Sequence, residues 1–374
     1  MNLTIYDAIV LGAGGVGSAA LCQLAARGAN VLGLDRFAPP HDKGSSHGQS
    51  RIIRQAYFEH PNYTPLLLES YRLWSELTCQ VDRRLYCEVG VLQMGPPDGV
   101  VVPGVLRSAS EHDLDVAQLA PDEVQRRWPA LSVPEGFVGV LESRAGYLFV
   151  EACVEAHLEL ARRAGAKLRC PVEVHSWQPG PPVRVQTTVG EFSADRLIIT
   201  AGAWAGPLLG ELGLALEVRR KSLFWYATNP RQESAHDDIP CFLYELPSGV
   251  FYGFPQLDER GVKIAEHSGG QAVDDPLRVD RGVNREEVER IEMFLGQHLP
   301  YVSRRRTDHA VCFYTMSPDE HFVVDRHPEH PHVVFAAGLS GHGFKFTPVL
   351  GQALAELALD GTTVLPIGFL ALRR

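Results

Sequence analysis

A glycine-rich turn between a short apolar strand and a small-residue helix constrains this chain of 374 residues more than any other feature. The apolar run 8–11 predicts a buried strand, and residues 18–27 predict a helix after the glycines of 12–17. Residues 29–34 return as a second strand that ends at Asp35. The pattern therefore predicts a complete βαβ unit at the start of the chain.

The spacing inside this unit indicates a dinucleotide-binding site. Gly12 allows a tight turn, Gly14 lets a pyrophosphate approach the backbone, and Gly17 lets helix and strand pack closely. Asp35 follows Gly17 by 18 residues, near the spacing of about 20 expected for an acid that binds ribose hydroxyls. The motif alone does not separate FAD from NAD, and a glycine-rich turn in another α/β protein is the alternative.

A second glycine-rich turn lies near the C-terminus and favours a flavin. Residues 332–338 predict a strand, Gly341 and Gly343 follow, and 350–357 place apolar residues at helical spacing. A helix N-terminus suits an isoalloxazine ring, because reduced flavin carries negative charge around N1 and the C2 carbonyl. A simple tight turn remains the alternative here. The segments 166–172 and 195–204 predict further strands, either of the nucleotide domain or of an ordinary core.

Composition limits the classes of partner. A net charge of −10 gives no overall attraction to nucleic acid or to an anionic bilayer. No apolar run reaches the roughly 18 to 20 residues of a transmembrane helix, and the acidic start does not resemble a signal peptide. Seven cysteines without a Cys-x-x-Cys pair suggest neither a zinc site nor disulfides. We therefore expect a cytoplasmic protein without a metal.

Four motifs in register resemble one family. The stretches 44–54, 310–315, 318–322 and 340–346 are similar to those of the monomeric sarcosine oxidase and N-methyltryptophan oxidase family of flavin amine oxidases. The resemblance runs from about residue 5 to about residue 360. It implies an α/β fold, α+β overall, in which a discontinuous Rossmann-like FAD-binding domain joins a second, mostly β-sheet substrate domain.

The resemblance also implies an activity. A secondary N-methyl amino acid and O2 would be the small-molecule partners of a monomeric enzyme. Hydride would pass from the N-methyl amine to the flavin, the imine would hydrolyse to formaldehyde and the amino acid, and O2 would reoxidise the flavin to give H2O2. Residues 1–85, 145–215 and 307–374 would form the FAD-binding domain, and residues 86–144 and 216–306 the substrate domain.

The resemblance assigns cofactor contacts residue by residue. Cys312 matches the cysteine that the family joins to the flavin 8α-methyl group as a thioether, whereas the residues alone favour an inert core thiol. The other positions implied to contact FAD are Gly12, Gly14, Gly17, Asp35, Arg36, Ser45, His47, Arg51, Val172, Gly202, Gly341, Gly343 and Lys345.

Three cations match family positions with chemical roles. Lys263 matches the lysine placed near flavin N5, where a fixed cation in a dry site stabilises the anion that forms from oxygen. Arg54 and Lys345 match the pair that binds the substrate carboxylate, the first as a planar fork and the second as a point charge. On the residues alone, Lys263 would be a solvated strand lysine and Arg54 a surface arginine.

Further matches line the family's substrate cavity. Arg51 matches a residue placed against the flavin ring, and His267 could tune the protonation of the substrate amine. Tyr252, Tyr314 and Leu243 match substrate-lining positions. An isolated histidine is also often a hydrogen-bonded structural residue, so that alternative stays open for His267.

Some residues depart from the family pattern. Residues 46–50 read Ser-His-Gly-Gln-Ser where the family often has His-His-Gly-Asp-Thr, so one histidine and one acid are missing. Leu243 stands where sarcosine-oxidising members tend to have methionine, and other segments mix the two branches. The preferred N-methyl amino acid therefore stays open. An oxidase of cyclic, pipecolate-like or glycated amino acids, an NAD-dependent dehydrogenase and a non-catalytic flavin protein are the alternatives.

Overall fold

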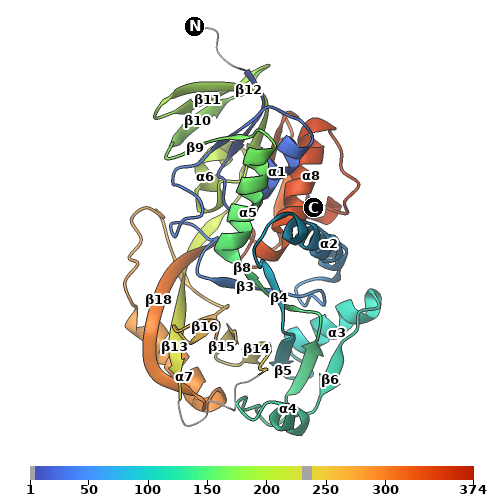
Figure 1. Cartoon of the computed structure of the whole chain (residues 1–374), viewed down its shortest axis with the longest axis vertical. Helices are drawn as coiled ribbons and strands as arrows, with labels where there is room; N and C mark the ends of the chain where they lie inside the picture. Colours follow the sequence, from blue (N-terminus) through green and yellow to red (C-terminus); the bar gives the residue numbers. More distant parts are fainter. Residues whose placement is uncertain (1–4, 230–237) are drawn as a thin grey trace.

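The computed structural model describes residues 5–229 and 238–374, and most of its strands form two large sheets at opposite ends of the long axis (Figure 1). Residues 1–4, part of the N-terminal stretch used for the cytoplasmic prediction, lie outside this description. Among the described helices, none combines the length and the apolar character that crossing a bilayer requires.

The first sheet has a parallel centre. Its strands in the described chain are β1 (Ile5–Leu11), β2 (Val31–Leu34), β9 (Lys167–Arg169), β10 (Val174–Gln178), β11 (Val183–Thr187), β12 (Gly190–Ile199), β19 (Val323–Arg326) and β20 (Val333–Ala337). β1 pairs in parallel with β2 and β12, β2 pairs with β9, and β12 pairs with β20. β10, β11 and β19 add antiparallel edges. Segments far apart in the sequence thus meet in one sheet.

Helices cover this sheet, and they explain why its central strands are apolar throughout. They are α1 (Gly15–Ala26), α2 (Thr64–Gln80), α5 (Val150–Arg163) and α8 (Thr347–Leu359), with the short α6 (Ala205–Leu208) nearby. α1 lies against β1 and β2 and also contacts α5 and α8 (Figure 1). Parallel strands covered in this way are buried on their faces, and residues 8–11 are almost completely shielded from solvent.

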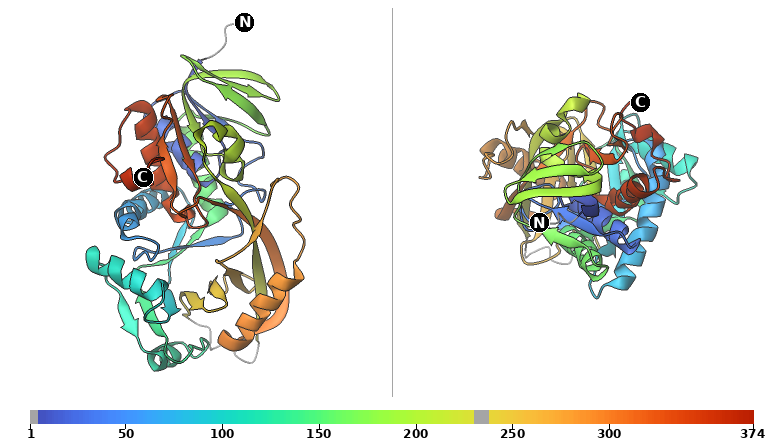
Figure 2. Two further views of the ribbon diagram at one scale, coloured as in Figure 1. Left: turned by 180° about the vertical axis from the view of Figure 1, so that it is seen from behind. Right: turned by 90° about the horizontal axis from the view of Figure 1, so that it is seen from above.

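The second sheet has nine strands within the described residues and is mixed. They are β5 (Val91–Gly95), β6 (Ala117–Leu119), β7 (Val138–Glu142), β13 (Glu217–Thr228), β14 (Cys241–Leu246), β15 (Gly249–Gly253), β16 (Val262–Glu266), β17 (Gln271–Ala272) and β18 (Val302–Met316). Helices α3 (Val101–Glu111), α4 (Pro121–Arg127) and α7 (Arg285–His298) accompany it, and Figure 2 shows α7 beside the long β13 and β18 strands. β13 and β18 pair along most of their length.

A small antiparallel sheet lies between the two large ones (Figure 1). It consists of β3 (Ser50–Ile53), β4 (Tyr86–Glu88) and β8 (Gly146–Phe149), and β8 pairs with both of the others. Short 3-10 turns complete the described chain at Pro61–Tyr63, Gly202–Trp204, Gly210–Leu212, Phe344–Phe346 and Gly368–Leu370. β3 carries Arg51, so this small sheet delivers that side chain to the region between the two large sheets.

These elements confirm the predicted fold class. The strand predicted at 8–11 is the second half of β1, and the helix predicted at 18–27 begins three residues earlier, at Gly15. The segments 166–172 and 195–204 contain β9 and the end of β12, and both strands belong to the parallel sheet. The strand at 332–338 and the helix that follows it are β20 and α8.

We predict that Gly351→Ala destabilises the fold, because Gly351 sets the spacing of α8 against α1. A Cβ there would lie 2.6 Å from the Ala19 Cβ and 2.8 Å from the Ala20 backbone nitrogen, so the helices would have to separate. Overpacking of this kind costs about 2 kcal/mol. Chemical denaturation should detect the loss, whereas Gly368→Ala should be neutral because nothing lies within 4 Å of its Cβ position. Equal stability of the two variants would contradict this prediction.

Candidate active site

One long pocket brings together most of the residues that the sequence singles out. It extends from the first glycine turn, past the ends of β12 and β20, to the surfaces of β14, β15 and β18. The predicted residues that line it are Gly12, Gly14, Asp35, Arg36, Ser45, Arg51, Arg54, Val172, Gly202, Leu243, Tyr252, His267, Tyr314, Gly341, Gly343 and Lys345. Gly17, His47, Lys263 and Cys312 do not line it directly.

The glycine turn has the geometry that its sequence requires. Gly12 has a φ of +86°, and a Cβ at this position would lie 2.7 Å from the Thr200 carbonyl oxygen. A Cβ at Gly17 would lie 1.8 Å from the Gly12 carbonyl oxygen, so helix and strand can only pack this closely without a side chain. The nearest atom to a Cβ at Gly14 is the Ser46 Oγ at 3.8 Å. The α1 N-terminus therefore lies open to the pocket at Gly14, whereas the Gly15 amide donates a hydrogen bond to Ser46 Oγ at 3.1 Å.

Asp35 holds this turn in place from the end of β2. It is 6% exposed; its Oδ2 accepts a hydrogen bond from the Ala13 amide at 2.7 Å, and its Oδ1 accepts one from Phe37 at 2.8 Å. Each carboxylate oxygen can accept a further bond. Asp35 therefore orders the turn and still offers acceptors to a hydroxyl group in the pocket.

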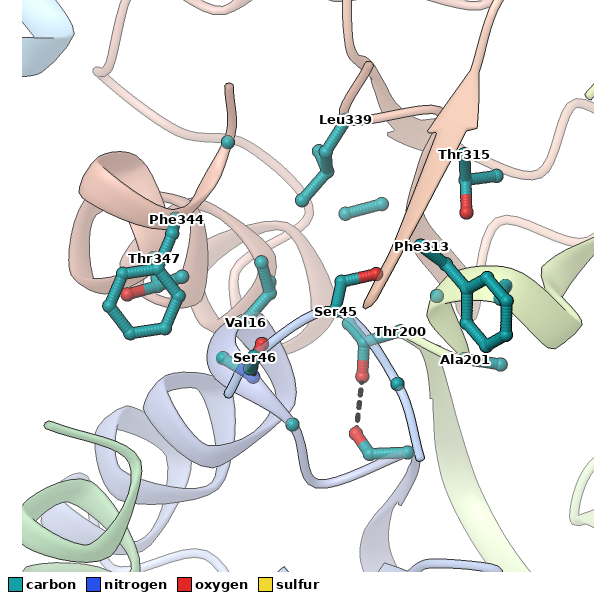
Figure 3. A pocket seen from close by; sticks show the side chains of 18 of the residues that line it. Val16, Ser45, Ser46, Thr200, Ala201, Phe313, Thr315, Leu339, Phe344 and Thr347 are labelled. Atoms are coloured by element: carbon teal, nitrogen blue, oxygen red, sulfur yellow. Dashed lines mark hydrogen bonds between the residues drawn. The ribbon is translucent and has the colours of Figure 1, made fainter. Parts of the chain in front are cut away.

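Buried polar atoms in this pocket fit a polar dinucleotide. Within the described residues, the Trp204 Nε1, Thr315 Oγ1 and Thr347 Oγ1 atoms are buried without a hydrogen-bond partner, and all three side chains line the pocket. Figure 3 shows Thr347 and Thr315 on opposite sides of it. Buried polar groups are rarely left without partners in native proteins. Their positions match a ligand that has polar groups along its length, as FAD does.

Arg54 lies at the other end of the pocket, and it is buried rather than at the surface. Its NH2 group donates to both oxygens of Glu59 at 2.8 Å, and its NH1 group donates to the Ala56 carbonyl at 3.1 Å. Glu142 fixes the same segment, because its two oxygens accept hydrogen bonds from the Gln55 and Ala56 amides at 2.7 and 2.9 Å. Burial raises the pKa of Glu142 to about 7.

Lys345 approaches the same end of the pocket from the second glycine loop. Its Nζ donates to the His342 carbonyl at 2.8 Å and to the Tyr57 hydroxyl at 3.3 Å. Burial, together with the charges of Arg54 and Arg51, lowers the pKa of Lys345 to about 7. The structure thus brings Arg54 and Lys345 together as buried basic groups with an acid, Glu59, beside them.

Three buried histidines of this region, His47, His267 and His342, have lowered pKa values and are neutral at physiological pH. Burial lowers the pKa of His267 to about 3, and it lowers the pKa of His342 and of His47 to about 4. His267 Nδ1 lies 3.2 Å from the Tyr314 hydroxyl. Leu243 and Tyr252 are register partners on β14 and β15 at the same end of the pocket. His267 is therefore available as a neutral hydrogen-bonding group.

Lys263 is completely buried, which excludes the alternative of a solvated strand lysine. Its Nζ donates to the carbonyl oxygens of Gly48 and Ser50 at 2.6 and 2.7 Å, and it lies over the Phe254 ring. Burial lowers its pKa well below the usual value for lysine. Cys312 is 1% exposed on β18, and its register partner on β13 is Lys221.

Several polar residues of this region were not predicted from the sequence, among them Glu59, Glu142 and Lys221. Glu59 pairs with Arg54, Glu142 holds the backbone beside Arg54, and Lys221 is a further buried lysine next to the pocket. Glu59 follows Arg54 by five positions, and that weak signal is the only one that could have identified it. Glu142 and Lys221 come from distant strands, so the sequence offers no spacing that connects them to the site.

A cluster of metal-binding residue types lies elsewhere. Glu211, His327 and His330 place potential ligand atoms within 4.8 Å of one another. However, the His327 Nδ1 accepts the backbone N–H groups of Glu329 and His330 at 3.2 Å, so its Nε2 carries the proton in the neutral ring. That Nε2 lies 2.9 Å from a Glu211 oxygen. A hydrogen bond to Glu211 therefore explains this cluster without an ion.

Together, the parallel sheet, its glycine turns and the adjoining β-sheet pocket define the class of dinucleotide-dependent oxidoreductases with a separate substrate-binding sheet. A family model described as FAD dependent oxidoreductase matches residues 7–357. The chain belongs to this FAD-dependent oxidoreductase family, in which it is similar to monomeric sarcosine oxidases and N-methyltryptophan oxidases.

Individual relatives cover nearly the whole chain. Monomeric sarcosine oxidase of Bacillus sp. (strain B-0618) is 40% identical over 99% of this chain and 96% of its own length. N-methyl-L-tryptophan oxidase of Yersinia pestis (strain Pestoides F) is 37% identical over 99% of both. Among solved structures, the open form of NikD, an unusual amino acid oxidase essential for nikkomycin biosynthesis, has a TM-score of 0.86 at 27% identity, covering 98% of both chains.

We predict that Glu59→Gln reduces the loss of stability in acid. Burial alone would raise the pKa of Glu59, but Arg54, His342 and Lys345 outweigh it and lower the pKa to about 2. Because the pKa of Glu59 is lower in the folded state than in the unfolded state, its ionised form stabilises the fold. This contribution to the free energy of unfolding is present above about pH 4.5 and is lost as the pH falls toward 2. The difference between the usual and the lowered pKa of Glu59 corresponds to about 3 kcal/mol of unfolding free energy.

The measurement is the free energy of unfolding as a function of pH between these limits. Exposed Glu76 supplies the control, since Glu76→Gln should keep the acid dependence of the wild type. The prediction is wrong if both variants lose stability in parallel with the wild type.

Proposed function

We propose that this protein oxidises N-methyl amino acids of the sarcosine or N-methyltryptophan type. The observation that carries this proposal is the pair of buried cations, Arg54 and Lys345, in the same pocket as the dinucleotide cradle. The names of the relatives support the same substrate class. Bound FAD would supply the chemistry of accepting a hydride from the amine and of passing its electrons to O2 to give H2O2. Water would hydrolyse the imine to formaldehyde and the amino acid.

Arg54 and Lys345 would bind the substrate carboxylate. The guanidinium of Arg54 already donates to Glu59, so a carboxylate must either displace Glu59 or use the remaining N–H groups. Lys345 approaches from the second glycine loop and adds a point charge. In a buried site, such charge-assisted bonds fix the substrate strongly and orient its amine.

The same cations favour the neutral form of the substrate amine, which is the form that can release a hydride. A positive charge nearby lowers the pKa of an amine, and burial does the same. His267 cannot contribute a further charge near neutral pH, because its pKa is lowered to about 3. We propose that His267, Tyr252, Tyr314 and Leu243 shape the substrate end of the pocket.

Lys263 would stabilise the anion that O2 becomes on accepting an electron. Its ammonium group is held by the carbonyl oxygens of Gly48 and Ser50, so it is fixed before the reaction starts. A fixed cation in a site without water stabilises developing charge at little reorganisation cost. Arg51, which donates to the Ser45 and Ser50 carbonyl oxygens, would lie against the flavin ring.

The finer cofactor contacts belong to the same proposal. Cys312 would hold FAD through a thioether, and the residues predicted to contact FAD would keep the roles that the resemblance implies. His47 and Gly17 do not line the pocket, so they would support the cofactor site through the residues that do line it. The two large sheets support a division into an FAD-binding domain and a substrate domain, but β18 (Val302–Met316) lies in the second sheet and crosses the boundary proposed at residue 307. A monomeric state, in keeping with the names of the relatives, and a cytoplasmic location complete the proposal.

We predict that purified holoenzyme releases H2O2 and formaldehyde in equal amounts from sarcosine, N-methyl-L-tryptophan or both. Methyl esters of the same compounds should have a KM at least about tenfold higher, because they lose the charge-assisted contacts to Arg54 and Lys345. In Lys263→Met, air should restore the oxidised visible spectrum roughly 100-fold more slowly.

A peroxide-coupled assay with N-methyl amino acids of increasing size measures the first result, and stopped-flow absorbance measures the last. Lys43→Met, at a half-exposed position, is the control for Lys263→Met. Absence of peroxide with every N-methyl amino acid would exclude the proposed function. Normal reoxidation of Lys263→Met would exclude only the role of this lysine.

We predict that Cys312→Ser abolishes covalent attachment of the flavin. Acid precipitation of the wild type should leave the yellow colour in the protein pellet, whereas the variant should release it into the supernatant. Cys241→Ser is the matched control, because Cys241 is equally buried in the same sheet. The thioether assignment fails if the precipitated Cys312→Ser protein remains yellow.

A further inference from the structure

Lys221 is a buried lysine to which the proposed function gives no role. It lies on β13, is 5% exposed, and faces the turn between β16 and β17. Its Nζ donates hydrogen bonds to three successive carbonyl oxygens, those of His267, Ser268 and Gly269, at 3.1, 2.6 and 3.3 Å. An ammonium group has three N–H bonds, so this turn can satisfy all of them.

The turn has the backbone conformation that this arrangement requires. Gly269 and Gly270 have φ values of +63° and +109°, which residues with side chains rarely adopt. A Cβ at Gly270 would lie 2.9 Å from the Lys221 Cδ, so the lysine stem packs directly on the glycine. The Lys221 side chain and the 267–270 turn therefore pack closely, and this packing requires glycine at 269 and 270.

The same ammonium group also contacts the other half of the pocket wall. Lys221 Nζ lies 5.1 Å from the centre of the Tyr314 ring, within the range of a cation–π interaction. The Tyr314 hydroxyl lies 3.2 Å from His267 Nδ1. Lys221 thus holds His267 through its backbone and Tyr314 through its ring, and the two side chains meet in the pocket.

We propose that Lys221 is a positioning residue that holds His267 and Tyr314 in the arrangement that binds the substrate. The proposal rests on the proposed function, because that function makes these two side chains the wall of the substrate site. Lys221 itself does not line the pocket. Its loss should therefore weaken binding and leave the chemical step nearly unchanged.

The charge state of Lys221 gives the proposal a second observable. Burial lowers the pKa of Lys221 to about 8. Above that pH the neutral amine keeps only two N–H bonds and loses its attraction to the Tyr314 ring. The charged and titratable groups that face it are Glu266 on β16, Cys312 and Tyr314 on β18, Glu287 on α7, Arg219 on β13 and His267 in the turn.

The experiment compares holoenzyme of the wild type, Lys221→Met and Lys221→Arg, with Arg278→Met as an exposed control. Arg278 pairs with Asp275, and its side chain is 88% exposed. For Lys221→Met we expect KM for the preferred N-methyl amino acid to rise roughly tenfold while kcat changes less than about twofold. Acetate, followed through the visible flavin spectrum, should show a similar rise in Kd, and Lys221→Arg should restore most of the affinity.

The pH dependence distinguishes positioning by a charge from simple packing. Between pH 7 and 9.5, Kd for acetate should rise more steeply in the wild type than in Lys221→Arg, whose guanidinium stays charged. The acetate ion does not titrate in this range. If Lys221→Met does not fold, the comparison of the acetate Kd profiles of the wild type and Lys221→Arg is sufficient to test the proposal.

Three results would count against the proposal. Unchanged KM and Kd in a folded Lys221→Met, or identical pH profiles in the wild type and Lys221→Arg, overturn the role of Lys221 alone. A wild type that oxidises no N-methyl amino acid overturns the proposed function and this proposal with it.

Discussion

A cation withdrawn from water must find acceptors inside the protein, and this requirement organises the whole pocket. Lys263 binds the backbone of β3 and its preceding loop, Lys221 binds the turn after β16, and Lys345 binds the second glycine loop. Backbone carbonyl oxygens supply most of these acceptors. Each buried charge therefore fixes a loop, and each loop carries side chains into the pocket. The positions of the buried charges and the conformations of the loops in this site therefore depend on each other.

The arrangement also reconciles an acidic protein with an anionic substrate. A net charge of −10 repels a carboxylate at long range, so binding depends on cations that the interior shields from solvent screening. The proposed function assigns this role to Arg54 and Lys345, and in this structure Glu59 pairs with Arg54. In this proposal, the electrostatic field of the buried basic groups, rather than the net charge of the protein, selects an anionic substrate.

Local patterns were sufficient for much of the fold. The strand, glycine turn and helix of residues 8–27 could be predicted because Gly12 and Gly17 are the only residue type that fits such a turn. Most of the residues that the motifs single out line one pocket. Glu59, Glu142 and Lys221 were missed, because their contacts are made across strands and loops that no local spacing connects.

The sequence by itself determined the nucleotide cradle and the class of fold, because steric rules for glycine and the periodicity of buried strands act over a few residues. Only the tertiary structure decided the charge states of the site. Lys263 would be a solvated lysine by local pattern, yet it is completely buried between two sheets. Burial depends on every element that packs around a side chain, and for Lys345 those elements include Tyr57 and His342, which lie far apart in the sequence.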